Sequence, residues 1–179
     1  MNGEDTAAAW ARARATGDLR LAPTDAAPPG MRRLVGPDPG PVWALPELPE
    51  GASPRTVTDL GLPLSTLERP TESAQVLACA LRCCWPSPQE PIWPGRPARL
   101  DDVISMYLQV NRGKTADYAR RAVLPALRRL DWTAWLQYRS GAELVRLGPQ
   151  VGAWNDFDLN TLRDLWRMMP VPEGSGGHA

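Results

Sequence analysis

Hydrophobic residues recur at helical spacing in four stretches of the C-terminal hundred residues. The pattern predicts helices over about 72–85, 101–110, 115–130 and 156–169. Thr71 can cap the first helix and Pro86 stops it, while acidic residues favour the starts of the second and fourth helices. The turn Asn111-Arg112-Gly113 joins the second helix to the third, because glycine readily adopts the left-handed conformation that ends a helix.

The third predicted helix is amphipathic. Its apolar flank consists of Ala119, Ala122, Val123, Ala126, Leu127 and Leu130. Its opposite flank is mostly basic and carries Lys114, Asp117, Arg121 and Arg128. Because Pro125 cannot donate a hydrogen bond to the carbonyl of Arg121, we expect the helix to kink or split in its distal half.

A β-hairpin is predicted after this helix. Two short strand-like runs, Thr133 to Tyr138 and Glu143 to Leu147, flank the segment Arg139-Ser140-Gly141-Ala142, in which glycine favours a turn. Further upstream, Ile92-Trp93 in a Pro-rich connector is a candidate edge strand.

The N-terminal 70 residues differ in character from the rest. An Ala- and Arg-rich stretch, Thr6 to Thr16, favours a short helix, and eleven prolines between Pro23 and Pro70 then exclude long helices and central strands. A short hairpin of Met31–Val35 with Val42–Leu45 and a disordered arm are both compatible with this composition. The segment is too apolar for a solvated linker, so we expect part of it to lie on the domain or on a partner.

The order helix, helix, tight turn, helix, two-stranded hairpin, helix over residues 71–170 resembles that of winged-helix domains. The resemblance implies a recognition helix at Lys114 to Leu130 and a wing at Arg139 to Ala142. The expected fold is mainly α with a small β-hairpin, an α+β winged-helix-type domain. A Pro/Gly-rich arm of residues 1–70 precedes it and a tail of residues 171–179 follows it.

Charge is distributed unevenly along a chain whose formal net charge is zero. Residues 1–95 sum to −3, residues 96–150 to +5 and residues 151–179 to −2. The whole molecule therefore has no long-range field that attracts nucleic acid or an anionic membrane, and any anionic partner would meet the middle segment.

The residues needed for catalysis or for a metal centre do not gather in this sequence. Cys79, Cys83 and Cys84 are an odd, clustered set, and the single histidine is His178 in the tail, so we expect buried reduced thiols, no disulfide framework and no zinc site. The paired acidic residues lie at the starts of predicted helices, where helix capping accounts for them without a catalytic role. Gly113-Lys114-Thr115 lacks the earlier glycine of a phosphate-binding loop. We therefore expect a protein that is not an enzyme and needs no cofactor; without a signal peptide or membrane span it would be cytoplasmic.

The first functional hypothesis is duplex DNA binding and regulation, which also predicts a homodimer. Basic side chains on the third helix and the wing would contact phosphates and bases, although a solvated polar face would have the same pattern. The candidate residues are Arg112, Lys114, Asp117, Arg121, Arg128, Arg139 and Arg146.

The alternative hypothesis is an adaptor that binds a larger protein partner with its Pro-rich arm. The candidate contacts are Trp43, Leu45, Leu48 and Trp93, for which docking within the chain is the competing explanation. The tryptophans in or beside predicted elements are expected to pack in the core; these are Trp85, Trp132, Trp135, Trp154 and Trp166.

Overall fold

The protein is described by a computed structural model that covers residues 19–27, 31–36, 42–46, 72–152 and 159–171. Within these ranges the chain is α+β, with five helices and two small antiparallel sheets. No helix in the described part of the chain is long and apolar enough to span a membrane.

The central helix of the C-terminal domain is α3, Glu72–Cys84. Nine of its thirteen residues are buried, because three other helices and two strands of the C-terminal sheet pack against it. A helix that is apolar around most of its circumference is stable only when it is surrounded in this way. The predicted helix over 72–85 is confirmed.

Two further helices pack on α3: α4, Leu100–Val110, and α5, Ala116–Trp132. The Asp102 carboxylate accepts the backbone N–H of Arg99 at 3.1 Å at the start of α4. Thr115 caps α5 by accepting the backbone N–H of Tyr118 at 3.3 Å. Gly113 between the two helices has a φ of 84°, which confirms the predicted left-handed turn.

The third helix was predicted to kink or split at Pro125, and the split does not occur. Helix α5 continues as one helix from Ala116 to Trp132. Pro125 is exposed, so water can replace the hydrogen bond that the carbonyl of Arg121 loses. The apolar flank is buried as predicted at Ala119, Val123, Ala126, Leu127 and Leu130.

The predicted C-terminal hairpin is confirmed as β5, Leu136–Arg139, and β6, Leu144–Leu147, joined by a 3₁₀ turn at Ser140–Ala142. Residues 133–135 form a turn instead of the start of a strand, and Ala134 there has a positive φ of 59°. The predicted strand at Ile92-Trp93 is wrong. A two-residue strand β4, Ala98–Arg99, pairs with β6 instead, which gives the order β4-β6-β5.

The N-terminal sheet contains β1, Leu19–Leu21, β2, Met31–Val35, and β3, Val42–Pro46, in the order β1-β3-β2. The predicted hairpin of Met31–Val35 with Val42–Leu45 is confirmed as β2 paired with β3. The strand β1 was not predicted, and the helix predicted over 6–16 lies outside the described residues.

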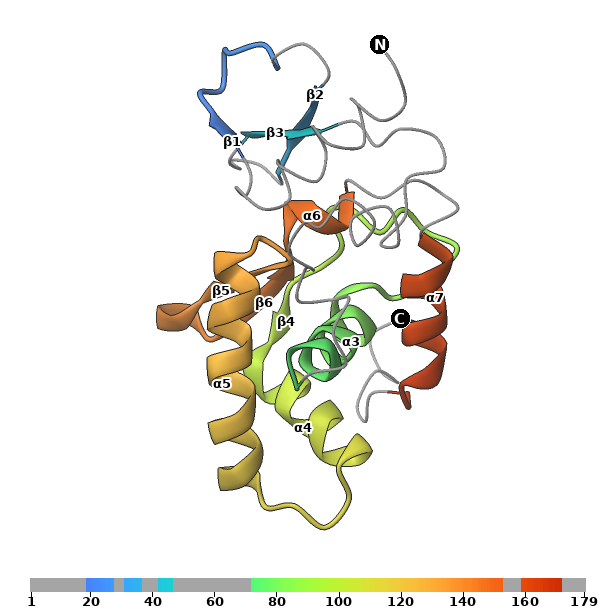
Figure 1. Ribbon diagram of the computed structural model, residues 1–179. Helices are drawn as coiled ribbons and strands as arrows, with labels where there is room; N and C mark the ends of the chain where they lie inside the picture. The colour runs from blue at the N-terminus through green and yellow to red at the C-terminus, as the bar shows by residue number, and fades with distance from the viewer. Residues whose placement is uncertain (1–18, 28–30, 37–41, 47–71, 153–158, 172–179) are drawn as a thin grey trace, which may run out of the picture.

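Two short helices complete the C-terminal domain: α6, Pro149–Gly152, and α7, Leu159–Met168. The helix α3 lies between α5 on one side and α7 on the other, and the N-terminal sheet lies beyond α6 (Figure 1). The predicted cap of the last helix at Asn155 or Asp156 lies outside the described residues.

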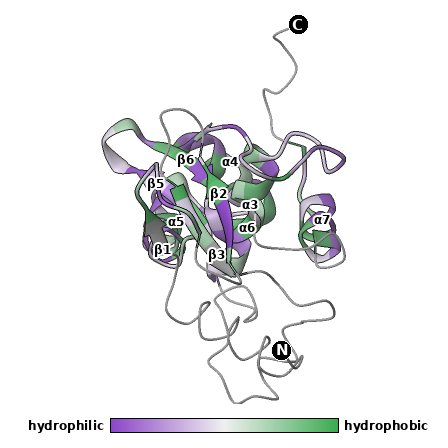
Figure 2. Cartoon of the chain, turned by 90° about the horizontal axis from the view of Figure 1, so that it is seen from above, coloured by the Kyte–Doolittle hydropathy of each residue, from purple (hydrophilic) through white to green (hydrophobic). Residues whose placement is uncertain are grey.

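Contacts of its side chains fix α7 on the end of α3. Hydrophobic and hydrophilic residues alternate around α7, whose Leu159 and Leu162 are buried (Figure 2). The indole N–H of Trp166 donates to the carbonyl of Trp85 at 2.7 Å, and the Arg82 guanidinium lies 3.6 Å from the centroid of the Trp166 ring. The buried leucines and the two polar contacts of Trp166 thus together hold α7 against α3.

Candidate nucleic-acid interface

The outward face of α5 brings several of the predicted basic residues together. Arg121, Pro125, Arg128 and Trp132 recur at intervals of three or four residues, and all four are exposed. Arg129 lies beside this row and is also exposed. Helical spacing therefore gathers three guanidinium groups along one side of a single helix.

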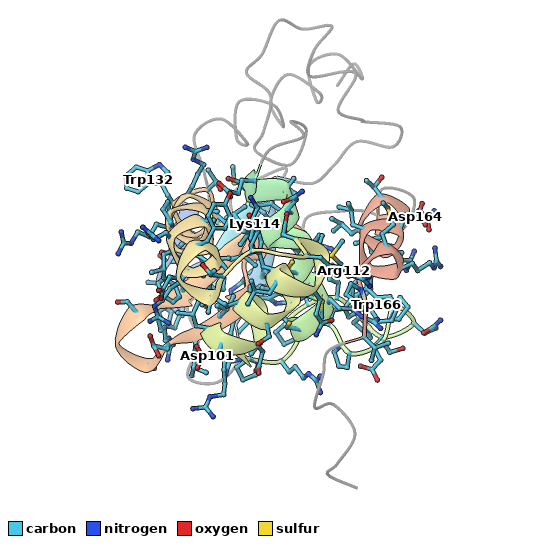
Figure 3. All side chains as sticks on the ribbon, turned by 90° about the horizontal axis from the view of Figure 1, so that it is seen from below. Asp101, Arg112, Lys114, Trp132, Asp164 and Trp166 are labelled. Atoms are coloured by element: carbon cyan, nitrogen blue, oxygen red, sulfur yellow. The ribbon has the colours of Figure 1, made fainter. Side chains whose placement is uncertain are left out.

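The start of α5 adds a lysine and an aromatic ring to the same surface. The Lys114 ammonium lies 4.7 Å from the centroid of the Tyr118 ring, a cation–π contact that orients both side chains. The Arg121 Nε donates to the backbone carbonyl of Asp117 at 3.2 Å, which keeps the guanidinium close to the first turn. Arg112 is exposed in the preceding turn, and Figure 3 shows Arg112 and Lys114 on the same side of the molecule.

Charge is dense in this part of the chain. Residues 112–139 contain seven basic and two acidic residues, a formal charge of +5 in a chain that is neutral as a whole. Six of the seven form no ion pair with a carboxylate in the described part of the chain: Arg112, Lys114, Arg121, Arg128, Arg129 and Arg139. Their positive charge is therefore available to an anionic ligand.

The seventh basic residue, Arg120, has a different role. Its guanidinium contacts the Glu143 carboxylate at 2.5 Å and the Asp101 carboxylate at 3.7 Å. The hydrogen bond to Glu143 raises the pKa of Arg120 further above its ordinary value. Arg120 thus connects α5 to the end of the hairpin turn and to the start of α4, and it holds the turn in place beside α5.

The hairpin presents the remaining two candidates on its outer side. Val145 and Leu147 of β6 are buried, so Arg146 between them points away from the core and is half-buried. Arg139 is exposed, and it pairs with Leu144 two residues before Arg146 on the same side of the sheet. The candidate residues thus lie in three groups: the turn before α5, the outer face of α5, and the outer face of the hairpin.

Sequence reasoning missed three members of this surface: Tyr118, Arg129 and Trp132. Trp132 was expected in the core, but its side chain is 90% exposed and projects outward from α5 (Figure 3). The helix predicted from the pattern ends at Leu130. A helix longer by two residues places Trp132 in the row of Arg121 and Arg128, and this spacing is the signal that could have found it.

The aromatic residues proposed as partner contacts lie against each other. Trp43 is 3% exposed, and its ring meets that of Trp93 edge-on at 5.7 Å between centroids. The indole N–H of Trp93 donates to the carbonyl of Val35 at 3.2 Å. These contacts of Trp43 and Trp93 are the docking within the chain that the sequence analysis gave as the competing explanation. The Leu45 side chain and all of Leu48 lie outside what the structure describes.

The three cysteines are free and buried in α3. Burial raises the pKa of Cys79 and of Cys83 to about 12, and it raises that of Cys84 as well. Protonated thiols are poor nucleophiles and poor metal ligands. Within the described ranges no three His, Cys, Asp or Glu side chains are grouped to hold a metal ion.

These thiols predict a loss of stability at alkaline pH. The pKa of the Cys79 thiol is 9.0 in an ordinary environment and about 12 in the fold. Between these pH values the unfolded chain therefore binds fewer protons than the native protein. The stabilisation is complete below pH 9.0 and is lost as the pH rises towards 12. We expect the urea midpoint to fall over this range, and to fall less in Cys79→Ala. An equal fall in both proteins would contradict the assignment.

The elements that carry this surface are α5, the turn before it and the β5–β6 hairpin, and Arg120 fixes the hairpin turn relative to the helix. No protein-family model, curated protein or solved structure matches the chain.

Proposed function

We propose that residues 71–170 form a winged-helix-type domain that binds duplex DNA through α5. The order α3, β4, α4, turn, α5, hairpin, α6, α7 supports this, because apart from the short elements β4 and α6 it follows the order of elements that the sequence shares with winged-helix domains. In such an arrangement the helix after the tight turn is the one that enters the major groove.

The observation that carries the proposal is the set of six exposed basic side chains on and around α5 that lack a described carboxylate partner. Each cation that contacts a phosphate releases condensed counterions, which supplies most of the affinity of a protein for DNA. A protein with zero net charge can bind DNA in this way, because the affinity depends on the local charge of the surface that meets the phosphates.

The roles within the surface follow from position. Arg121 lies on the outermost line of α5 in its N-terminal half, where a recognition helix meets base edges, and Arg commonly forms a bidentate contact with guanine. Arg112 and Lys114 lie in the turn before α5 and Arg139 lies on the hairpin, where they would contact phosphates. Arg120 would position the hairpin turn without touching DNA, because both of its acidic partners are already in place.

We expect the double variant Lys114→Ala, Arg121→Ala to weaken duplex binding and to reduce the slope of log affinity against log salt by about one for each phosphate that the protein no longer binds. Fluorescence anisotropy with a labelled duplex at several salt concentrations measures both quantities. Arg167→Ala is the matched control, since Arg167 is an exposed arginine on α7 that pairs with Asp164 at 2.7 Å. The melting temperature should not change in either protein, because exposed charges contribute little to stability.

A second candidate function is docking of a protein partner on the same face. Trp132 favours it, because a tryptophan with 90% of its side chain exposed costs solvation, and Trp and Arg are the residues most often found at interaction hot spots. If wild-type protein has no salt-dependent affinity for duplex DNA, the DNA proposal fails and this candidate replaces it.

A further inference from the structure

We propose that the C-terminal end of α5 binds an unpaired base of DNA by stacking it on Trp132, so that the protein prefers a duplex that continues into a single strand. This contact rests on the proposed function, since it would add to the contacts that Arg121 makes with the same DNA. The exposure of the Trp132 ring and the charges around it carry the proposal.

Trp132 differs from every other tryptophan in the described ranges, because it alone is exposed. Trp85 and Trp166 donate their indole N–H groups to backbone carbonyls, and Trp43 and Trp93 lie edge-on against each other. Trp132, with 90% of its surface in water, has neither a hydrogen bond nor a ring contact with a described residue. A large flat apolar ring left in water marks a contact surface.

Two guanidinium groups accompany this ring. Arg128 and Arg129 precede Trp132 by four and three residues, so all three side chains share one side of α5. Both arginines are exposed, and neither forms an ion pair with a described carboxylate. The adjacent acid, Asp131, accepts the backbone N–H of Tyr138 at 3.0 Å and is thereby held against the hairpin. Cations beside an aromatic ring are the combination that binds single strands, phosphates on the charge and bases on the ring.

The aromatic residue at the other end of α5 does not offer the same platform. Tyr118 is 43% exposed, but the Lys114 ammonium lies 4.7 Å from the centroid of its ring and covers one face. No cation lies over the Trp132 ring in the described part of the chain. Figure 3 shows Trp132 projecting away from the helix, where a base can approach it.

The position of Trp132 along α5 favours an unpaired base over a paired one. Trp132 follows Arg121 by eleven positions, which places it about 16 Å further along the helix axis. The major groove is only about 12 Å wide, so Trp132 would lie outside the groove that Arg121 enters. In a duplex the faces of the bases are stacked on one another, whereas an unpaired base can turn its face to an indole ring. A duplex that opens into a single strand supplies both contacts.

Fluorescence anisotropy with the full chain tests this on three labelled DNAs of the same duplex sequence. One is blunt, one carries a single-stranded overhang of about six nucleotides, and one carries an overhang of the same length made of abasic sugars. Overhangs of both polarities are compared. The abasic overhang keeps every phosphate and removes only the bases, so the ratio of the two overhang affinities isolates stacking.

We expect the wild-type protein to bind the overhang with bases about five- to tenfold more tightly than the abasic one, the lower part of the range for stacking on an aromatic side chain. Trp132→Ala should remove this difference, and Trp132→Phe should keep part of it. Met168→Ala is the matched control, because Met168 is a large apolar side chain, 75% exposed, on α7. That variant should keep the full difference. Circular dichroism confirms that each variant is folded.

The results that would overturn the inference differ from those that would overturn the proposed function. Salt-dependent binding of the blunt duplex with equal affinities for the two overhangs overturns the stacking on Trp132 and leaves duplex binding in place. An equal loss of affinity of Trp132→Ala for all three DNAs would mean that the ring contacts the duplex itself, which also overturns it. If none of the three DNAs binds, the proposed function and this inference fail together.

Discussion

Replacing Gly148 with alanine is expected to destabilise the C-terminal domain by about 3 kcal/mol, at the upper end of the cost of overpacking. A Cβ at this position would lie 2.1 Å from the carbonyl oxygen of Ala134 and 2.6 Å from its carbonyl carbon. Both neighbours are backbone atoms, so no rotamer change can relieve the clash. Two hydrogen bonds depend on this close approach. The N–H of Gly148 donates to the carbonyl of Trp135 at 2.8 Å, and the N–H of Gln150 donates to the carbonyl of Ala134 at 3.1 Å.

Gly141→Ala is the matched control for this variant. Gly141 lies in the hairpin turn, and a Cβ there would meet nothing within 4 Å. Its stability should change by no more than about 0.5 kcal/mol, as is usual for surface substitutions. Urea denaturation of the two variants compares them directly. Equal midpoints would mean that the end of β6 does not approach residues 134–135 as closely as the structure shows.

Leu127→Ala and Leu162→Ala are each expected to cost about 2 to 5 kcal/mol in free energy of unfolding. Both side chains are completely buried, Leu127 on α5 and Leu162 on α7, and both helices pack on α3. Removing three carbon atoms from such a site loses their transfer energy and leaves a cavity that rigid neighbours fill only in part.

The half-buried Leu124 offers a comparison on the same helix as Leu127. Leu124→Ala should cost less than Leu127→Ala, because part of that side chain already contacts water and the gap it leaves is open to solvent. Denaturant unfolding followed by circular dichroism gives all three values. Decreases below about 0.5 kcal/mol at Leu127 and Leu162 would mean that the buried faces of α5 and α7 are assigned wrongly.

Local rules were sufficient for four of the five described helices and for the C-terminal hairpin. The apolar stripe of α5, the glycine turn at Gly113 and the Ser140-Gly141 turn are determined by side chains that are neighbours in the sequence. They predicted the order of these four helices and the hairpin, and they predicted that Arg121 and Arg128 share the outer face of one helix. The basic part of the candidate site was therefore visible in the sequence.

Pairing and docking between distant segments were decided by the tertiary structure. The strand β4 is two residues long, too short for any pattern, and it exists because β6 supplies its hydrogen-bond partners. Trp132 was placed in the core because local pattern gives no measure of where a helix ends relative to its neighbours.

The sequence by itself determined four of the five described helices, the turns at Gly113 and Gly141, and the charge of the face that α5 presents, because these depend on interactions within a few residues. The tertiary structure alone decided which basic residues stay unpaired and which, like Arg120, are neutralised by Asp101 and Glu143. It also decided that Trp43 and Trp93 contact each other while Trp132 remains exposed. The reason is physical: burial and ion pairing are properties of the distances between segments, and those distances follow from how the whole core packs.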